Sequence, residues 1–282
     1  MKVNLFCIGA QKAGTTTLYE ILIKHPDISF SRAKELHFFN TKRYKKGIDY
    51  YHSLFNDRKA KYFADFTPGY MIDPKVSQRL FRYNPNAKII AILRHPVDRA
   101  FSNYQMHQRN GKEKRTFKSS ILAEIEAIKL KNSVLNYDGY VMRGLYSKQL
   151  KYFLDLFDHH NIKIILFEDL INKQKETIAE VYAFLEVEEI EYTQPTIANE
   201  NYKPRFRLIH DAFYKIPNLT RIRIKAYIPR GIKNSINKLI KVKTERKTVP
   251  LDAKAILMTF YQEEFDDLEK LIKRDLSAWK KK

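Results

Sequence analysis

The residues of this chain with the clearest capacity for chemistry form one run, Gly9–Thr17, with the sequence GAQKAGTTT. The run follows a short apolar stretch, Val3–Ile8, and precedes a helical pattern that ends at His25-Pro26. A loop between a strand and a helix lets backbone N–H groups and the helix N-terminus surround an anion. Gly9 and Gly14 have the spacing of the nucleotide-binding P-loop, G-x-x-x-x-G-K-S/T. We therefore predict an anion-binding loop; the alternative is a tight turn whose glycines and threonines only cap a helix.

This loop departs from the P-loop pattern at one position. Thr15 stands where that pattern has lysine, and the lysine here is Lys12, inside the loop. The P-loop lysine reaches the β- and γ-phosphates of a nucleotide, while the next Ser/Thr and an acidic strand end hold Mg²⁺. Here the apolar run Lys88–Leu93 is followed by Arg94 and His95, a cationic strand end unsuited to Mg²⁺. The sequence predicts an anion with no γ-phosphate and no metal, and a phosphosulfate fits that description.

Arg94 and Ser102 are candidates for a second phosphate site. Arg94 follows a buried strand, and Ser102 falls in the first turns of the helix expected from about Asp98. The carboxyl end of a strand and the adjoining helix N-terminus are where open α/β sheets bind ligands. Arginine offers a planar fork to a phosphate, and a serine hydroxyl adds a donor. Two phosphate sites side by side suit a nucleotide with phosphates at both ends, although an arginine after a strand is by itself more often a solvated residue.

Glu35 and His37 are candidates for acid–base chemistry. Glu35 lies in the otherwise basic run Arg32–His37. One interpretation is a surface carboxylate paired with Lys34 or Arg32. The other is a general base that takes a proton from an attacking acceptor, with His37 orienting or sharing that proton. The residues alone leave both open.

The pattern of the elements predicts an α/β fold. Two continuous apolar runs read as strands covered on both faces, a third run is weaker, and helical patterns alternate with them. We expect a three-layer P-loop-like fold with a central, mostly parallel sheet flanked by helices. No linker divides the chain, so a single domain, 1–282, is expected. The expected strands are Val3–Ile8, Tyr62–Asp65, Lys88–Leu93 and Asn161–Phe167; the expected helices include Lys173–Leu185, Thr116–Leu130, Tyr140–Leu156 and one long amphipathic helix, Asp252–Ser277.

Positive charge is concentrated in one segment. The formal net charge is +20, and the segment Tyr202–Lys247, expected to form loops and short helices, holds 14 Lys and Arg residues against two acids. Such a segment attracts nucleic acid, an anionic membrane, an acidic glycan or a multiply charged nucleotide. No nucleic-acid-binding motif occurs in the sequence, so a nucleic-acid partner is not expected. A peripheral membrane contact through 202–247 stays open.

The sequence also bears on the compartment. Cys7 is the single cysteine, in an apolar run, so it cannot form an intrachain disulfide and reads as a core residue. The N-terminus lacks a signal-peptide pattern, and no stretch approaches the ~18 apolar residues of a membrane span. We expect a cytoplasmic protein.

Four runs of the sequence match the motifs of one enzyme family. They are QKAGTTT at Gln11–Thr17, KELHFF at Lys34–Phe39, LRHPVDRAFSNY at Leu93–Tyr104 and RDLSAW at Arg274–Trp279. With them the chain resembles the sulfotransferases that use 3′-phosphoadenylyl sulfate (PAPS), especially the heparan sulfate sulfotransferases and their prokaryotic relatives. The first three runs are similar to the 5′-phosphosulfate loop, the catalytic-base segment and the 3′-phosphate motif of that family.

The resemblance implies a function and roles for residues. It implies metal-independent, in-line transfer of a sulfuryl group from PAPS to a hydroxyl or amino group of a carbohydrate or glycolipid acceptor, leaving adenosine 3′,5′-bisphosphate (PAP). Glu35 would be the catalytic base, assisted by His37, and Lys12 would stabilise the leaving group. The expected nucleotide-binding residues are Gln11, Lys12, Ala13, Gly14, Thr15, Thr16 and Thr17 for the 5′-phosphate, Arg94 and Ser102 for the 3′-phosphate, and Arg246 and Lys247 as cations that close over the nucleotide.

Two departures and two rival functions accompany this interpretation. Members close to the glycosaminoglycan enzymes often carry a lysine where this chain has Phe66, and the paired C-terminal cysteines of the Golgi enzymes are absent. One rival is a P-loop kinase or NTPase, which the absent lysine after Gly14 disfavours. The other is a basic nucleic-acid-binding protein, suggested by the net charge alone.

Overall fold

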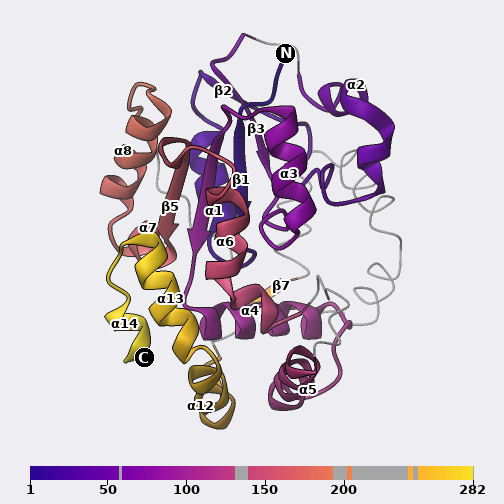
Figure 1. Cartoon of the computed structure of the whole chain (residues 1–282), viewed down its shortest axis with the longest axis vertical. Coiled ribbons are helices and arrows are strands. Elements are labelled where there is room, and N and C mark those ends of the chain that lie inside the picture. The colour runs from indigo at the N-terminus through magenta and orange to yellow at the C-terminus, as the bar shows by residue number, and fades with distance from the viewer. Residues whose placement is uncertain (57–58, 131–138, 193–201, 205–240, 244–246, 282) are drawn as a thin grey trace.

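A computed structural model describes residues 1–56, 59–130, 139–192, 202–204, 241–243 and 247–281 (Figure 1). Arg246 and most of the basic segment 202–247 therefore lie outside the described residues. Apart from Lys247, the described part of that segment forms a short antiparallel pair, β6 (Tyr202–Pro204) with β7 (Lys241–Lys243), where loops and short helices were expected.

The centre of the molecule is a five-stranded parallel sheet in the order β2-β3-β1-β4-β5. Its three central strands are almost wholly buried, as the continuous apolar runs predict for strands covered on both faces. The predicted α/β class and mostly parallel sheet are confirmed. The strands are β1 Leu5–Gly9, β2 Ile28–Phe30, β3 Tyr62–Phe66, β4 Lys88–Leu93 and β5 Ile162–Leu166.

Helices cover both faces of this sheet and give it three layers. The connection from β1 to β2 and the connection from β3 to β4 run in opposite directions across the sheet. Because such crossovers are right-handed, their helices lie on opposite faces. Helix α1 (Thr15–Leu22) therefore covers one face, and α3 (Pro74–Tyr83), which packs beside α6 (Tyr146–Leu154), covers the other (Figure 1).

The remaining helices flank these layers. Helix α4 (Pro96–Arg109) begins with proline at its first position, where the missing N–H costs nothing. The others are α2 Gly47–His52, α5 Phe117–Lys129, α7 Phe167–Asn172, α8 Gln174–Leu185, α12 Leu251–Phe260, α13 Gln262–Ile272 and α14 Ser277–Lys280, with 3-10 turns at Lys42–Lys46, Met142–Gly144 and His159–Asn161. Among the described residues, no helix has both the length and the apolar character needed to cross a membrane.

Several element predictions were wrong in detail. The expected helix Asp252–Ser277 breaks at Tyr261 into α12 and α13, and α14 follows separately. The expected helix Tyr140–Leu156 is a 3-10 turn followed by the shorter α6. Strand β2 was not predicted, because three residues are too few to show a period.

One edge of the sheet gathers the candidate site. The strands are parallel, so the loops after β1, β3, β4 and β5 all leave from their carboxyl ends at the same edge. The glycine loop follows β1, the Arg94 turn follows β4, and Phe167 follows β5. The segment with Glu35 comes shortly after β2.

Candidate active site

The glycine loop adopts a conformation that Gly14 makes possible. Gly14 has a φ of 91°, in the region that favours glycine, and it precedes α1 directly. A Cβ added there would lie 2.9 Å from the Phe167 ring. Gly14 therefore lets the chain turn into α1 while α7 packs against the loop. It offers no side chain to cap α1, which leaves the first N–H groups of that helix available to an anion.

The side chains of the predicted loop residues divide between core and surface. Ala13, Thr15 and Thr17 are buried, whereas Gln11 and Thr16 are half-buried. Lys12, also half-buried, has a φ of 72°, and its carbonyl accepts a hydrogen bond from Arg94 Nη1 at 3.1 Å. The structure thus joins the two predicted phosphate sites through a direct contact.

Lys12 lies among other cations. Burial and the positive charges of Arg109 and Arg94 lower the pKa of its amine from 10.5 to about 8, and Glu35 opposes them weakly. Arg109, the last residue of α4, was not predicted as a site residue. The available signal was its position seven residues after Ser102, which places both residues on one helical face. Crowded cations repel one another, and a bound anion relieves that repulsion.

Arg94 is held from several sides. Its guanidinium lies over the Phe167 ring, with 4.7 Å from Cζ to the ring centroid. Its backbone carbonyl accepts a hydrogen bond from the Tyr146 hydroxyl at 2.8 Å. Ser102 is half-buried in the second turn of α4. Arg94 and Ser102 therefore lie at the strand end and helix start that were predicted for them.

Glu35 pairs with His37. Its Oε2 lies 3.2 Å from His37 Nε2, and the side chains of Glu35 and His37 are 33% and 38% exposed. Burial alone would raise the pKa of Glu35, but the hydrogen bond from His37 and the charges of His37, Lys34 and Arg143 outweigh it, so that its pKa falls below the ordinary value. The carboxylate is therefore ionised at neutral pH, the state that a general base needs.

The expected alternative, a surface pair of Glu35 with Lys34 or Arg32, is not what the structure shows. Lys34 Nζ donates to Thr16 Oγ1 at 2.9 Å, and Arg32 Nε donates to Asn56 Oδ1 at 3.1 Å. The Lys34 contact links the Glu35 segment directly to the first turn of α1. Lys34 is thus a residue of the site, whereas the prediction used it only as part of a motif and as an alternative partner of Glu35.

A buried carboxylate supports the backbone beside Glu35. Asp65, fully buried at the end of β3, accepts hydrogen bonds from the hydroxyls of Tyr51 at 2.9 Å, Thr67 at 2.7 Å and Tyr70 at 2.8 Å. The Thr67 hydroxyl accepts from Leu36 N at 3.2 Å, and the Tyr70 hydroxyl accepts from Phe38 N at 3.0 Å. The network fixes the residues on both sides of His37. It was not predicted, since no local pattern relates positions so far apart in sequence.

Three other residues singled out from the sequence lie in the core or on the surface. Phe66 is buried, with its ring against Phe30 at 5.1 Å between centroids, so it belongs to the core. Cys7 is also buried, and burial raises the pKa of its thiol to about 12, as expected for a core residue. Lys247 is exposed shortly before α12. No cluster of three or more His, Cys, Asp or Glu side chains suited to a metal occurs in the described parts of the chain.

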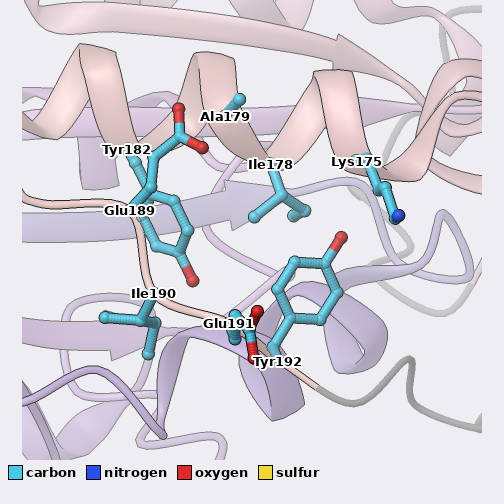
Figure 2. A pocket seen from close by; sticks show the side chains of 8 residues that line it. All are labelled: Lys175, Ile178, Ala179, Tyr182, Glu189, Ile190, Glu191 and Tyr192. Atoms are coloured by element: carbon cyan, nitrogen blue, oxygen red, sulfur yellow. The ribbon is translucent and has the colours of Figure 1, made fainter.

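A pocket lies apart from these residues, between α8 and the segment that follows it (Figure 2). Its volume is about 530 Å³, and none of the predicted site residues lines it. Its lining consists of Lys175, Ile178, Ala179, Tyr182, Glu189, Ile190, Glu191 and Tyr192.

Comparison with known sequences identifies related proteins. A family model described as the sulfotransferase domain matches residues 2–239. The membrane-associated sulfotransferase kil1 of Dictyostelium discoideum is 26% identical over 316 residues, covering 84% of this chain and 64% of that protein. The bifunctional heparan sulfate N-deacetylase/N-sulfotransferase 1 of Xenopus tropicalis is 32% identical over 197 residues, covering 65% of this chain and 22% of that protein. The chain thus spans less than two thirds of the length of either relative.

Solved structures share the fold. A sulfotransferase from Alicyclobacillus acidocaldarius is 26% identical with a TM-score of 0.70, and the match covers 99% of each chain. Mouse sulfotransferase SULT7A1, solved in complex with PAP, is 16% identical with a TM-score of 0.50 over 99% of this chain and 86% of that one, a likeness of fold alone. The family match over residues 2–239 and the structural match over nearly the whole chain show that this protein belongs to the sulfotransferase family and is an enzyme of that class.

Proposed function

We propose that this sulfotransferase moves a sulfuryl group from PAPS to a hydroxyl or amino group of a carbohydrate or glycolipid acceptor. The observation that carries the proposal is the position of an ionised carboxylate, Glu35, on a segment that Lys34 fastens to the cation-lined glycine loop. A base and an anion site are thereby brought together at one edge of the sheet. Transfer to an acceptor needs both.

The residues fit a nucleotide that carries anionic groups at both ends. The N–H groups at the start of α1 and the ammonium group of Lys12 suit the 5′-phosphosulfate. Arg94, whose planar guanidinium is braced on Phe167, suits the 3′-phosphate together with Ser102. We also propose that Arg246 and Lys247 add cations over the bound nucleotide.

The reaction is a single in-line displacement. Glu35 takes the proton of the acceptor as the acceptor oxygen or nitrogen forms a bond to sulfur. The bond between sulfur and the bridging oxygen breaks, and its electron pair stays on that oxygen, which departs with PAP. Lys12 stabilises this developing negative charge, and the loop holds donor and acceptor in line. No step requires a metal.

The class of acceptor is proposed from the relatives and from charge. One relative is named as a heparan sulfate N-sulfotransferase, which favours a sugar acceptor. The net charge of +20 favours an acceptor that is itself anionic. A contact with an anionic membrane through 202–247 would suit a glycolipid acceptor, and a cytoplasmic location stays a prediction.

Replacement of Glu35 by glutamine tests the proposal. Glu35→Gln keeps the shape and hydrogen-bonding capacity of the side chain and removes its proton-accepting charge. Single-turnover sulfate transfer with saturating PAPS should slow by about 10²–10⁴-fold, the usual contribution of a positioned base. The affinity for PAP should be almost unchanged, because Glu35 faces the acceptor. Glu180→Gln, a change on the surface of α8, provides the control.

Two results would contradict the proposal. A Glu35→Gln enzyme within about threefold of the original rate would remove Glu35 as the base, since a base contributes far more. Thermal stabilisation by ATP with Mg²⁺ but not by PAP would favour the kinase or NTPase instead. Single-turnover sulfate transfer measured in EDTA tests whether the reaction needs a metal. Transfer should persist under chelation.

A further inference from the structure

The C-terminal segment Arg274–Trp279 packs against the turn that carries Arg94. His95, only 1% exposed, donates from Nε2 to the backbone carbonyl of Trp279 at 3.1 Å. The rings of His95 and Trp279 also meet edge to face, with centroids 5.8 Å apart. The neighbour of Arg94 in the chain is thereby fixed to a residue 184 positions away.

The same segment holds the helix on which the guanidinium of Arg94 lies. Arg274 Nη2 is 2.6 Å from Asp169 Oδ2 of α7, and α7 begins at Phe167. The ring of Phe167 supports the Arg94 guanidinium. Figure 1 shows α7, α13 and α14 together at one side of the molecule. The Arg274–Asp169 pair thus joins the C-terminal segment to the helix that carries the aromatic ring under Arg94.

A third connection reaches Arg94 through α6. The Tyr146 hydroxyl donates to the Arg94 carbonyl, and the Tyr146 ring lies 6.5 Å from the ring of Trp279. Glu264 of α13 accepts from both the backbone N and the hydroxyl of Ser147, each at 2.7 Å. The elements at the C-terminus therefore contact His95, which follows Arg94 in the chain, the helix that carries the ring beneath the Arg94 side chain, and the tyrosine whose hydroxyl donates to the Arg94 carbonyl.

We infer that Arg274 and Trp279 are positioning residues of the 3′-phosphate site. They act through His95, Phe167 and Tyr146, which orient the Arg94 guanidinium. A planar fork binds phosphate well only when its orientation is fixed before the ligand arrives. The inference rests on the proposed function, in which Arg94 binds the 3′-phosphate. It assigns a role to the motif RDLSAW.

Titration calorimetry with PAP and adenosine 5′-monophosphate tests this inference, because the second nucleotide lacks the 3′-phosphate. Arg274→Ala should weaken PAP binding by about threefold to tenfold, within the range over which residues without ligand contact modulate affinity. Binding of the monophosphate should stay the same. Asp169→Ala should behave alike, and the reversed pair Arg274→Asp with Asp169→Arg should recover PAP affinity.

The matched control is another surface ion pair. Lys118 and Asp252 lie 3.1 Å apart and are 50% and 55% exposed, but they join α5 to α12. Lys118→Ala should leave the affinity for both nucleotides unchanged.

Trp279→Phe, which keeps an aromatic ring in the packed position, should raise the KM for PAPS without changing kcat.

The outcomes separate this inference from the proposed function. If the unaltered enzyme binds PAP no more tightly than the monophosphate, the assignment of Arg94 and the inference both fail. If the unaltered enzyme prefers PAP and Arg274→Ala keeps that preference in full, the inference alone is wrong. Equal losses for the two nucleotides would also overturn it, since they indicate a general loss of structure. Arg274 is 47% exposed, so Arg274→Ala is compatible with folding.

Discussion

At the level of single residues, Lys12 combines a proposed catalytic role with an unfavourable electrostatic position. Its amine is charged among Arg94, Arg109 and Lys34, and its pKa is lowered to about 8. A bound dianion would favour the charged amine, so that the pKa of Lys12 rises in the complex. Nucleotide binding is therefore coupled to proton uptake over the interval between the two pKa values.

We predict that PAP affinity falls as the pH rises through about 8. Below that pH the amine is already charged in the free enzyme, and binding needs no proton. Above it, binding must first charge the amine, so the affinity should fall by up to about tenfold per pH unit until the pKa of the complex is reached. Calorimetry from pH 7 to pH 9.5 in buffers of different ionisation enthalpy measures both the affinity and the proton uptake.

Lys12→Arg provides the comparison for this pH dependence. The guanidinium stays charged throughout the range, so its PAP affinity should vary little with pH even if the affinity itself is lower. The same slope in Lys12→Arg as in the unaltered enzyme would assign the titration to another group.

Arg94 carries a prediction about nucleotide selection. Arg94→Ala should weaken PAP binding by roughly tenfold or more, because a charge-assisted contact to a charged group contributes about 1.5–3 kcal/mol. Binding of adenosine 5′-monophosphate should barely change. Arg94→Lys should be intermediate, since it keeps the charge and loses the fork. Equal losses for both nucleotides would contradict the assignment of the 3′-phosphate to Arg94.

At the level of elements, the loop that carries Glu35 depends on the end of β3. The Tyr70 hydroxyl donates to Asp65 and accepts from Phe38 N, so it connects the sheet to the loop. The Tyr51 hydroxyl also donates to Asp65, but this hydrogen bond involves no backbone group of the loop. Both tyrosines are fully buried. A comparison of variants at the two tyrosines therefore distinguishes a role in positioning the loop from a role in stabilising the core.

We predict that Tyr70→Phe slows sulfate transfer more than Tyr51→Phe does. Each variant removes one hydrogen bond to buried Asp65 and should lower the free energy of unfolding by about 1–3 kcal/mol. Only Tyr70→Phe also releases the backbone beside His37, so the position of Glu35 should loosen. Single-turnover rates, measured well below the unfolding temperature of each variant, check the difference. Equal rates for the two variants would show that the network serves stability alone.

The elements differ in how far the sequence determines them. Strand β4 was predictable because five consecutive apolar residues, Ile89–Leu93, are buried and covered on both faces. The break at Tyr261 was not, since the apolar stripe continues through it and only the backbone, with φ −90° and ψ 6°, leaves the helix. Strand β2 is defined by pairing with β3 and not by a pattern of its own.

The candidate site divides in the same way. Lys12, Arg94 and Glu35 were found because each lies in a short run whose residue types indicate a chemical role. Each run comes directly after a strand or forms part of a motif. Asp65 was not found, because its relation to the site depends on packing between distant segments, and Arg109 was missed although it lies seven residues after Ser102 on the same helical face. Local sequence therefore gives the groups proposed to contact substrate, and the tertiary structure gives the groups that orient and charge them.

At the level of the whole molecule, positive charge extends to the side of the site that we propose faces the acceptor. The run Lys42–Lys46 has the sequence KRYKK, and three of its residues are exposed. It is tied to the proposed base segment, because the Thr41 hydroxyl donates to the carbonyl of His37 at 2.6 Å. With a net charge of +20 in the chain, these cations should attract an anionic acceptor from beyond contact distance.

We predict that salt weakens the use of an anionic glycan acceptor and leaves a neutral one almost unaffected. Raising the salt concentration from ~0.05 M to ~0.5 M shortens the screening length from roughly 14 Å to 4 Å, so that charges beyond direct contact cease to act. The KM for a carboxylated or sulfated oligosaccharide should then rise by about an order of magnitude, whereas kcat at saturation should stay the same. Steady-state assays with saturating PAPS at each salt concentration measure this.

Lys42→Ser with Lys45→Ser should reduce the salt dependence for the anionic acceptor and leave PAP affinity unchanged, because these lysines belong to the proposed acceptor side. A KM that is indifferent to salt, or that rises equally for the neutral oligosaccharide, would show that the cations of this surface do not select the acceptor.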